Sequence, residues 1–158
     1  MMHGFIPPQR YFPYLTWSQI EQMPNKENVV IIQPVGAIEQ HGPHLPIAVD
    51  SAISLGVLGK ALSKLDHDLP AYALPCLYYG KSNEHIGFPG TITLSAQTLL
   101  AVITEMALSI YRSGFRKLIL MNSHGDSLKS WKSRLGISIK NIQTFRYFPC
   151  LPGVYLML

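Results

Sequence analysis

The sequence predicts an α/β fold in which helices cover both faces of a mainly parallel sheet. Short apolar runs of strand length occur at residues 29–35 and 117–121, and segments with apolar residues at helical spacing lie between them. Strands that alternate with helices in this way form parallel sheets, because each helix crosses a face of the sheet to reach the next strand. With 158 residues, the chain can build one packed core and is too short for two ordinary domains.

The first half of the chain is expected to form a strand, a polar loop and a helix. A short helix is predicted over residues 17–23. The run 29–35 is rich in β-branched residues and is typical of a strand that is buried on both faces. After the polar loop, apolar residues recur at helical spacing over residues 51–65, and Asp50 or Ser51 is expected to cap the amino end of this helix.

The second half repeats the alternation. A second strand is predicted over residues 71–79, followed by a loop with glycine and proline and by a short extended segment at 91–94. Ser95 is a good N-cap for a long amphipathic helix that runs to Arg112. The third buried strand follows at 117–121. In such sheets, functional residues collect just beyond the carboxyl ends of the strands.

Composition and charge limit the classes of partner. The net charge is +4, but residues 1–126 contain eight Lys or Arg and all nine acidic residues, whereas the last 32 residues hold five bases and no acid, so we expect no nucleic-acid partner. There is no basic leader with an apolar core and no window of about 18 apolar residues, so we expect no membrane association. Cys76 and Cys150 lack zinc-finger spacing, which favours a cytoplasmic location.

Polar side chains follow two of the predicted strands where each one ends. Glu39 and His41 lie in the loop after the first strand, Asp50 precedes the next helix, and His124 follows the third strand. Residues two apart on an extended segment project to the same side, and carboxylate and imidazole groups are ligands of borderline divalent metals. A Glu-x-His pair in a loop is more often a solvated pair, but the strand context favours a metal site here.

Three sequence blocks around these residues resemble the signature of the creatininase (creatinine amidohydrolase) family. They are PVGAIEQHGPHLP at 34–46, EHIGFPGT at 84–91 and NSHG at 122–125, and the resemblance extends over residues 17–125. It implies a three-layer αβα sandwich and the hydrolysis of a cyclic amide or another non-peptide C–N bond by a metal-activated water. One or two divalent ions are implied, with zinc as the first expectation and manganese or iron as alternatives.

The resemblance also assigns roles to individual residues. Glu39 and His124 match ligands of one metal, His41 matches a ligand of the second, and Asp50 matches the carboxylate that bridges both. Ser82 falls where the family has a serine that contacts the substrate. Asp126 stands where creatininases have a glutamate that ligates the second metal, so it is a further candidate ligand.

Two other histidines leave alternatives open. His44 either orients a metal ligand or is a loop histidine that is hydrogen-bonded to the backbone. His85 belongs to the second sequence block, and its expected role is to hold the turn that follows it.

The sequence after residue 126 departs from the family. We expect residues 1–126 to form a creatininase-like α/β domain that lacks the C-terminal part of the family fold, and residues 127–158 to be an atypical basic and aromatic tail. The histidine that shuttles protons in the family would lie in the missing segment, so no catalytic residue is assigned. The hypothesis is that the gene carries a frameshift near residue 126, and resequencing the locus would test it.

These observations lead to two functional hypotheses. The first is a metal-dependent amidohydrolase of the creatininase type that acts on a small-molecule amide, with a homo-oligomer expected for an intact chain. The alternative is a catalytically inactive truncated family member that at most binds metal or partners.

Overall fold

The computed structural model describes residues 2–124 together with the strands Phe145–Tyr147 and Tyr155–Met157. Asp126 lies outside the described residues. The same holds for residues 127–158 except for the backbone of these two strands, so the predicted tail is not tested.

A five-stranded sheet in the order β2-β1-β3-β5-β4 forms the centre of the described structure. β1 (Val30–Val35) lies between β2 (Ala71–Ala73) and β3 (Lys117–Asn122) and runs parallel to both. β5 (Tyr155–Met157) runs parallel to β3 on its other side, and β4 (Phe145–Tyr147) pairs antiparallel with β5 at the edge. The predicted mainly parallel sheet is confirmed.

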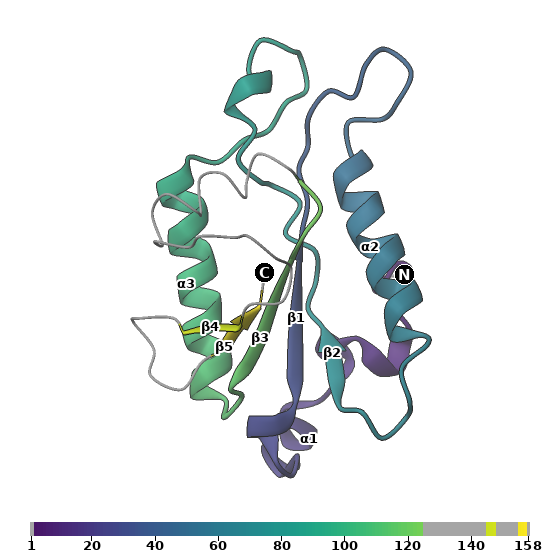
Figure 1. The fold of residues 1–158 in the computed structure, drawn as a ribbon, viewed down its shortest axis with the longest axis vertical. Coiled ribbons are helices and arrows are strands. Elements are labelled where there is room, and N and C mark those ends of the chain that lie inside the picture. Colours follow the sequence, from purple (N-terminus) through teal and green to yellow (C-terminus); the bar gives the residue numbers. More distant parts are fainter. Residues whose placement is uncertain (1, 125–144, 148–154, 158) are drawn as a thin grey trace.

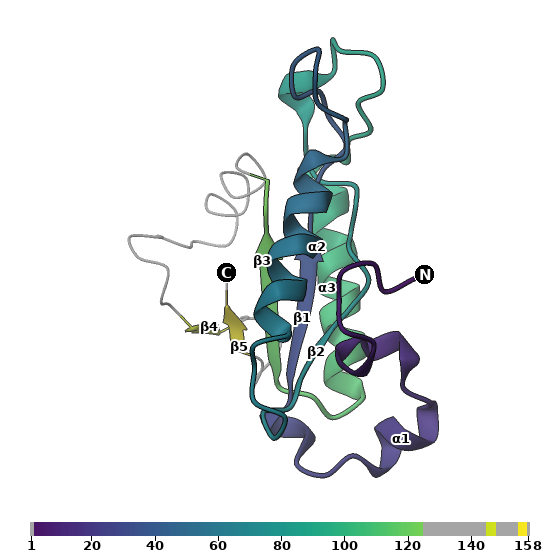
Figure 2. The ribbon, with the colours of Figure 1, turned by 90° about the vertical axis from the view of Figure 1, so that its right-hand side faces the viewer.

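Two helices cover opposite faces of the parallel strands. Figures 1 and 2 show α2 (Val49–Leu62) on one face and α3 (Ala96–Arg112) on the other. Alternate residues of β1 supply the two cores: Ile31 packs in the core with α3, and Ile32 packs in the core with α2. The α3 core contains Val29, Ile31, Val35, Leu74, Leu99, Ile103, Ala107, Phe115, Leu118 and Leu120, and the α2 core contains Ile6, Tyr11, Ile32, Leu58, Leu62, Ala71 and Ala73. The layers are therefore helix, sheet and helix.

The segment before β1 consists of short helical turns at the surface. It comprises η1 (Pro8–Arg10), η2 (Phe12–Tyr14), α1 (Trp17–Gln22) and η3 (Lys26–Asn28). The predicted short helix is α1, and it begins with a capping box in which the side chains of Thr16 and Gln19 satisfy each other's backbone N–H groups.

A buried arginine ties this segment to the turn before β2. Arg10 donates to the Asp66 carbonyl at 2.7 Å and also to the Leu69 carbonyl. Hydrogen bonds from a charged donor are the stronger kind, so these contacts hold the N-terminal segment against the α2 face.

Several predicted boundaries need correction. The predicted cap of α2 is wrong, because α2 begins at Val49 with Ala48 as an N-cap that makes no side-chain hydrogen bond. Asp50 and Ser51 lie inside its first turn instead: the Asp50 carboxylate faces His41, and the Ser51 hydroxyl donates to the Ala37 carbonyl at 3.3 Å. Both side chains thus make tertiary contacts that compete with capping.

The second strand is shorter than predicted. β2 covers only Ala71–Ala73. Leu74 N–H still donates to the Ile32 carbonyl at 2.8 Å, but the next donor of the ladder would come from Pro34 of β1, which has no N–H. Pairing resumes at an isolated bridge, where Leu77 N–H donates to the Pro34 carbonyl at 2.9 Å.

The remaining predictions for the second half are confirmed. Ser95 caps α3 by accepting a hydrogen bond from Thr98 N–H, and Gly114 follows the helix with a φ of 99°. Ile92 of the predicted extended segment pairs with Ile38. No helix in the described part of the chain is long and apolar enough to cross a membrane.

The connections make β1 a topological switch point. From β1 the chain passes through α2 to β2 on one side, and then through α3 to β3 on the other side of β1. The loops after the two neighbouring strands β1 and β3 diverge here, which leaves space for a site at their carboxyl ends. In Figure 1 the loop between β1 and α2 and the loop that precedes α3 extend beyond this end of the sheet.

Candidate metal centre

The loop after β1 carries Glu39 into a buried position. Gly36 is in tight contact with the first turn of α2, since a Cβ atom at this position would lie 2.4 Å from Ser51 Oγ and 2.7 Å from Ser51 Cα. The loop is closed by a hydrogen bond of 3.0 Å from Glu39 N–H to the Ile47 carbonyl. Glu39 is 5% exposed, so its carboxylate needs charged or hydrogen-bonding partners inside the protein.

Asp50 reaches the same region from the first turn of α2. Ser123, just after β3, donates its hydroxyl to the Asp50 carbonyl at 2.7 Å and so joins the helix to the strand end. Burial raises the pKa of the Asp50 carboxyl above its ordinary value, the neighbouring Glu39 adds to this, and His41 and His124 act in the opposite direction. The ionised Asp50 carboxylate would therefore be favoured by an additional cation.

His41 directs an acceptor nitrogen at Asp50. The Nδ1 atom of His41 lies 3.1 Å from the Glu39 backbone carbonyl, and because a carbonyl can only accept, Nδ1 carries the proton. In the neutral ring, Nε2 then has a lone pair, and it lies 3.3 Å from Asp50 Oδ1. Two acceptor atoms at this distance need a cation between them, either a proton or a metal ion. The backbone contact at Nδ1 is the arrangement that orients a histidine for metal binding.

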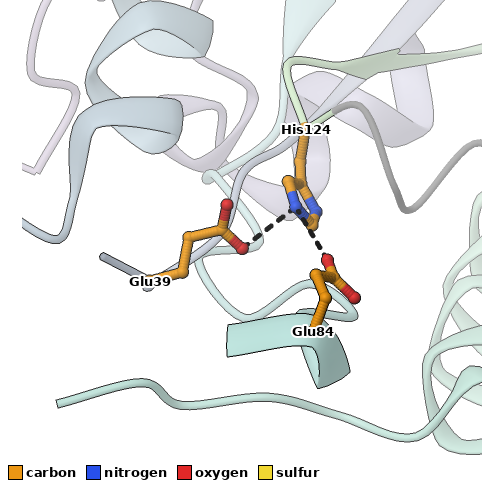
Figure 3. Close-up of side chains that lie close together, drawn as sticks. All are labelled: Glu39, Glu84 and His124. Carbon is orange, nitrogen blue, oxygen red and sulfur yellow. Dashed lines mark ion pairs between the residues drawn. The ribbon is translucent and has the colours of Figure 1, made fainter. Parts of the chain in front are cut away.

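Glu39, Glu84 and His124 converge from three separate elements (Figure 3). His124 Nε2 lies 3.0 Å from Glu39 Oε2 and 3.7 Å from Glu84 Oε1. Glu84 lies on η4 (Asn83–His85), and its other oxygen is 3.7 Å from Lys81 Nζ. His124 is 4% exposed, so this cluster extends from the interior to the surface, where Glu84 lies.

The ligand-type atoms form two overlapping groups. Glu39, His41 and Asp50 form one, and Glu39, Glu84 and His124 form the other, with the ligand atoms of each group within 4.8 Å of one another. In the structure, Glu39 belongs to both groups. The assignment of Asp50 as the bridge between two ions stays a prediction.

The residues present fit a divalent metal. Each group offers carboxylate oxygens and one imidazole nitrogen, which is the donor set that zinc and similar ions accept. Asp50 Oδ2 is buried and accepts no hydrogen bond from the described residues, and Glu39 Oε2 accepts none of normal geometry. Buried carboxylate oxygens without such partners are costly, and a metal ion would satisfy them.

The predicted substrate serine lies in the same loop region. Ser82 is fully buried, its N–H donates to Thr93 Oγ1 at 2.7 Å, and its Oγ has no hydrogen-bond partner among the described residues. Its contact with substrate stays a prediction, as does ligation by Asp126, which lies outside the described residues.

Glu84 is a residue of the site that was not predicted from the sequence. Its position in the second block with His85 was the available signal, but the loop gave no indication that its carboxylate would reach His124. The His85 side chain also faces the site, with Nε2 3.5 Å from Glu39 Oε1. Its backbone carbonyl accepts a hydrogen bond from Thr91 Oγ1 in the following turn, so the predicted turn-holding role does not use the imidazole ring. His44 is exposed.

This combination of fold and site is characteristic of α/β metal-dependent enzymes, in which carboxylates and histidines gather at the carboxyl ends of parallel strands. The sequence profile of the Creatininase family, described as creatinine amidohydrolase, matches residues 13–135, and the chain belongs to this family.

Two curated relatives illustrate the range of the family. The chain is 35% identical over 115 residues to a creatinine amidohydrolase of Pseudomonas putida, with 70% of this chain and 43% of that protein covered. It is 30% identical over 123 residues to a mycofactocin precursor peptide peptidase of Mycolicibacterium smegmatis, with 77% of this chain and 49% of the relative covered. The chain thus spans about half the length of these relatives.

Solved structures confirm the fold assignment. A structure described as creatininase with Mn superposes with a TM-score of 0.65 at 28% identity, covering 82% of this chain and 55% of that one. A mutant creatininase of the Zn-Zn type superposes with a TM-score of 0.65 at 30% identity, covering 76% of this chain and 48% of the other.

Proposed function

We propose that this chain carries the metal-binding part of a creatininase-type amidohydrolase that cleaves an amide C–N bond. The supporting observation is the pair of overlapping carboxylate and histidine groups near the ends of β1 and β3, in which the buried oxygen Asp50 Oδ2 has no hydrogen-bond donor among the residues that the structure describes. The named relatives act on creatinine and on a precursor peptide, and an amide is the bond that these substrates have in common. A cyclic or other small-molecule amide is our first expectation.

The positions of the side chains suggest which residues bind each ion. His41 and Asp50 would hold one divalent ion, Glu39 and His124 would hold another, and Glu84 is within reach of the second. The role of Asp50 as a ligand common to both ions remains a prediction. Zinc and manganese are the first candidates because the descriptions of two similar creatininase structures name these metals. A bound divalent ion supplies a water whose pKa is lowered toward about 7 and polarises the substrate carbonyl. Ser82 is proposed to contact the substrate from the loop before α3.

Metal binding tests this proposal directly. We expect the chain to bind zinc in competition with a chromophoric chelator, and we expect Asp50→Asn and Glu39→Gln each to weaken binding by at least about 10-fold because each removes a ligand charge. Glu105→Gln is the matched control, since Glu105 is an acidic residue on α3 that belongs to neither group. Equal zinc affinity in all four proteins would refute the proposed site.

Turnover separates the two functional hypotheses. Hydrolysis of a panel of amides, followed as the ring-opened product of cyclic amides and as the released amine of short peptides, and lost on Asp50→Asn, supports the hydrolase. Zinc binding without turnover on any of these amides supports the alternative, a family member that binds metal and is catalytically inactive.

A further inference from the structure

We propose that His85 is a positioning residue that holds Glu39 in the orientation needed for metal binding. This inference rests on the proposed metal site. The His85 side chain extends from η4 towards the loop after β1, and its Nε2 atom lies 3.5 Å from Glu39 Oε1. Hydrogen bonds in such sites are often long before the ligand is bound. The other Glu39 oxygen, Oε2, faces His124 Nε2 at 3.0 Å.

A chain of hydrogen bonds fixes which His85 nitrogen carries the proton. It starts at Gly42, whose backbone N–H donates to Gln40 Oε1 at 2.9 Å. An N–H can only donate, so the oxygen of the Gln40 amide must be the atom that faces Gly42. The amide nitrogen, Gln40 Nε2, is then the atom 3.1 Å from His85 Nδ1.

The orientation of Gln40 determines the tautomer of His85. An amide NH₂ group has no lone pair to offer, so Gln40 Nε2 donates and His85 Nδ1 accepts. A neutral imidazole has one donor and one acceptor nitrogen, so the proton of His85 lies on Nε2. The donor nitrogen is therefore the one that faces the Glu39 carboxylate.

His41 and His85 consequently have opposite tautomers and different roles. His41 donates through Nδ1 to the Glu39 backbone carbonyl, which leaves Nε2 free as a metal ligand. His85 presents a donor at Nε2 and cannot ligate a metal through that atom while neutral. Its N–H is directed at Glu39 Oε1 over a distance of 3.5 Å, which we expect to shorten when a metal binds. The other oxygen of Glu39, Oε2, then remains available to the group that contains His124.

The loop around His85 is held by its backbone, so the side chain can be changed separately. The His85 carbonyl accepts from Phe88 N–H at 2.9 Å and from Thr91 Oγ1 at 2.8 Å, and the His85 N–H donates to the Ser82 carbonyl at 3.0 Å. None of these bonds uses the imidazole ring. A substitution at His85 is therefore expected to remove the contact with Glu39 while the turn is retained.

The experiment measures zinc affinity by chelator competition in three variants. His85→Leu removes the N–H donor that faces Glu39. It is expected to weaken zinc binding by about 10–100-fold, which is the usual effect of removing the hydrogen-bond partner of a metal ligand. His85→Gln retains a side-chain N–H and is expected to restore most of the affinity. Ile86→Ala, at an exposed neighbour on the same loop, is the matched control and should bind as the wild type does. Unchanged affinity in His85→Leu would overturn the positioning role.

A second measurement does not depend on metal. Long-range ¹H–¹⁵N NMR of the metal-free chain distinguishes protonated from unprotonated ring nitrogens, and the His85 signals are those that His85→Gln removes. We expect a protonated Nε2 and an unprotonated Nδ1, and a proton on Nδ1 alone would overturn the inference. A wild-type chain that binds no zinc would instead refute the proposed function, and the NMR result would still decide the tautomer.

Discussion

Gly36 is the position where adding a single methyl group should most clearly disturb the site. It follows β1 and lies against the first turn of α2, which carries Asp50. A Cβ atom at Gly36 would lie 2.7 Å from Ser51 Cα and 2.8 Å from Ser51 N, and these are backbone atoms that cannot rotate away. To restore the 3.4 Å of ordinary van der Waals contact, the helix turn must move back by about 0.7 Å.

The expected magnitude follows from this displacement. Overpacking of this kind costs about 1–3 kcal/mol of unfolding free energy. The displaced turn would also carry Asp50 away from His41, whose facing atoms are now 3.3 Å apart. Because functional sites require placement within about 0.5 Å, a shift of about 0.7 Å should lower zinc affinity as well as stability.

Gly56→Ala provides the matched control. Gly56 lies in the middle of α2, and a Cβ atom added there meets nothing within 4 Å. Replacing a helical glycine by alanine should raise the unfolding free energy by about 0.5–1 kcal/mol and leave zinc affinity unchanged. Urea unfolding followed by circular dichroism measures stability, and chelator competition measures affinity. If Gly36→Ala were as stable as the wild type and bound zinc equally well, the proposed contact between Gly36 and α2 would be wrong.

Three further predictions concern the rest of the structure. Arg10→Ala should lower the unfolding free energy by about 1.5–3 kcal/mol, since it removes charge-assisted hydrogen bonds to the carbonyls before β2, and an unchanged urea midpoint would contradict this. Ile103→Ala should cost about 2–5 kcal/mol in the same assay, because Ile103 is 3% exposed in the α3 core. Burial raises the pKa of the Cys76 thiol to about 11. Its contribution to stability is therefore fully present below pH 9 and is lost as the pH rises from about 9 to about 11, because the unfolded chain loses this proton first. Cys76→Ala should make unfolding less sensitive to pH across that range.

The order of the main elements could be predicted from the sequence because their signals are local. The apolar run that forms β1 and the helical period that forms α3 are properties of consecutive residues, and Ser95 caps α3 as expected. The boundaries failed where tertiary contacts compete with local preferences. Asp50 and Ser51 are good capping residues, yet their side chains make contacts outside the helix, and α2 begins before them.

The candidate site could likewise be predicted only in part. Four of its residues could be proposed from sequence, since a parallel sheet brings the ends of its strands together and their loops then share one edge. Glu84 could not, because nothing in a loop of glycine, proline and polar residues specifies how far its carboxylate extends. Ligation by Asp126 and substrate contact by Ser82 stay predictions.

By itself, the sequence determined the α/β class, the family and the residue types available for metal binding, because periodicity and motif spacing are encoded along the chain. Only the tertiary structure decided how those residues are paired. The proton of His85 on Nε2 and the position of Glu39 between two groups depend on atoms that are far apart in sequence. The proton of His41 on Nδ1 depends on the conformation of its own loop, because its partner is only two residues away. Hydrogen-bond donors and acceptors are assigned by such contacts in space, which no local pattern specifies.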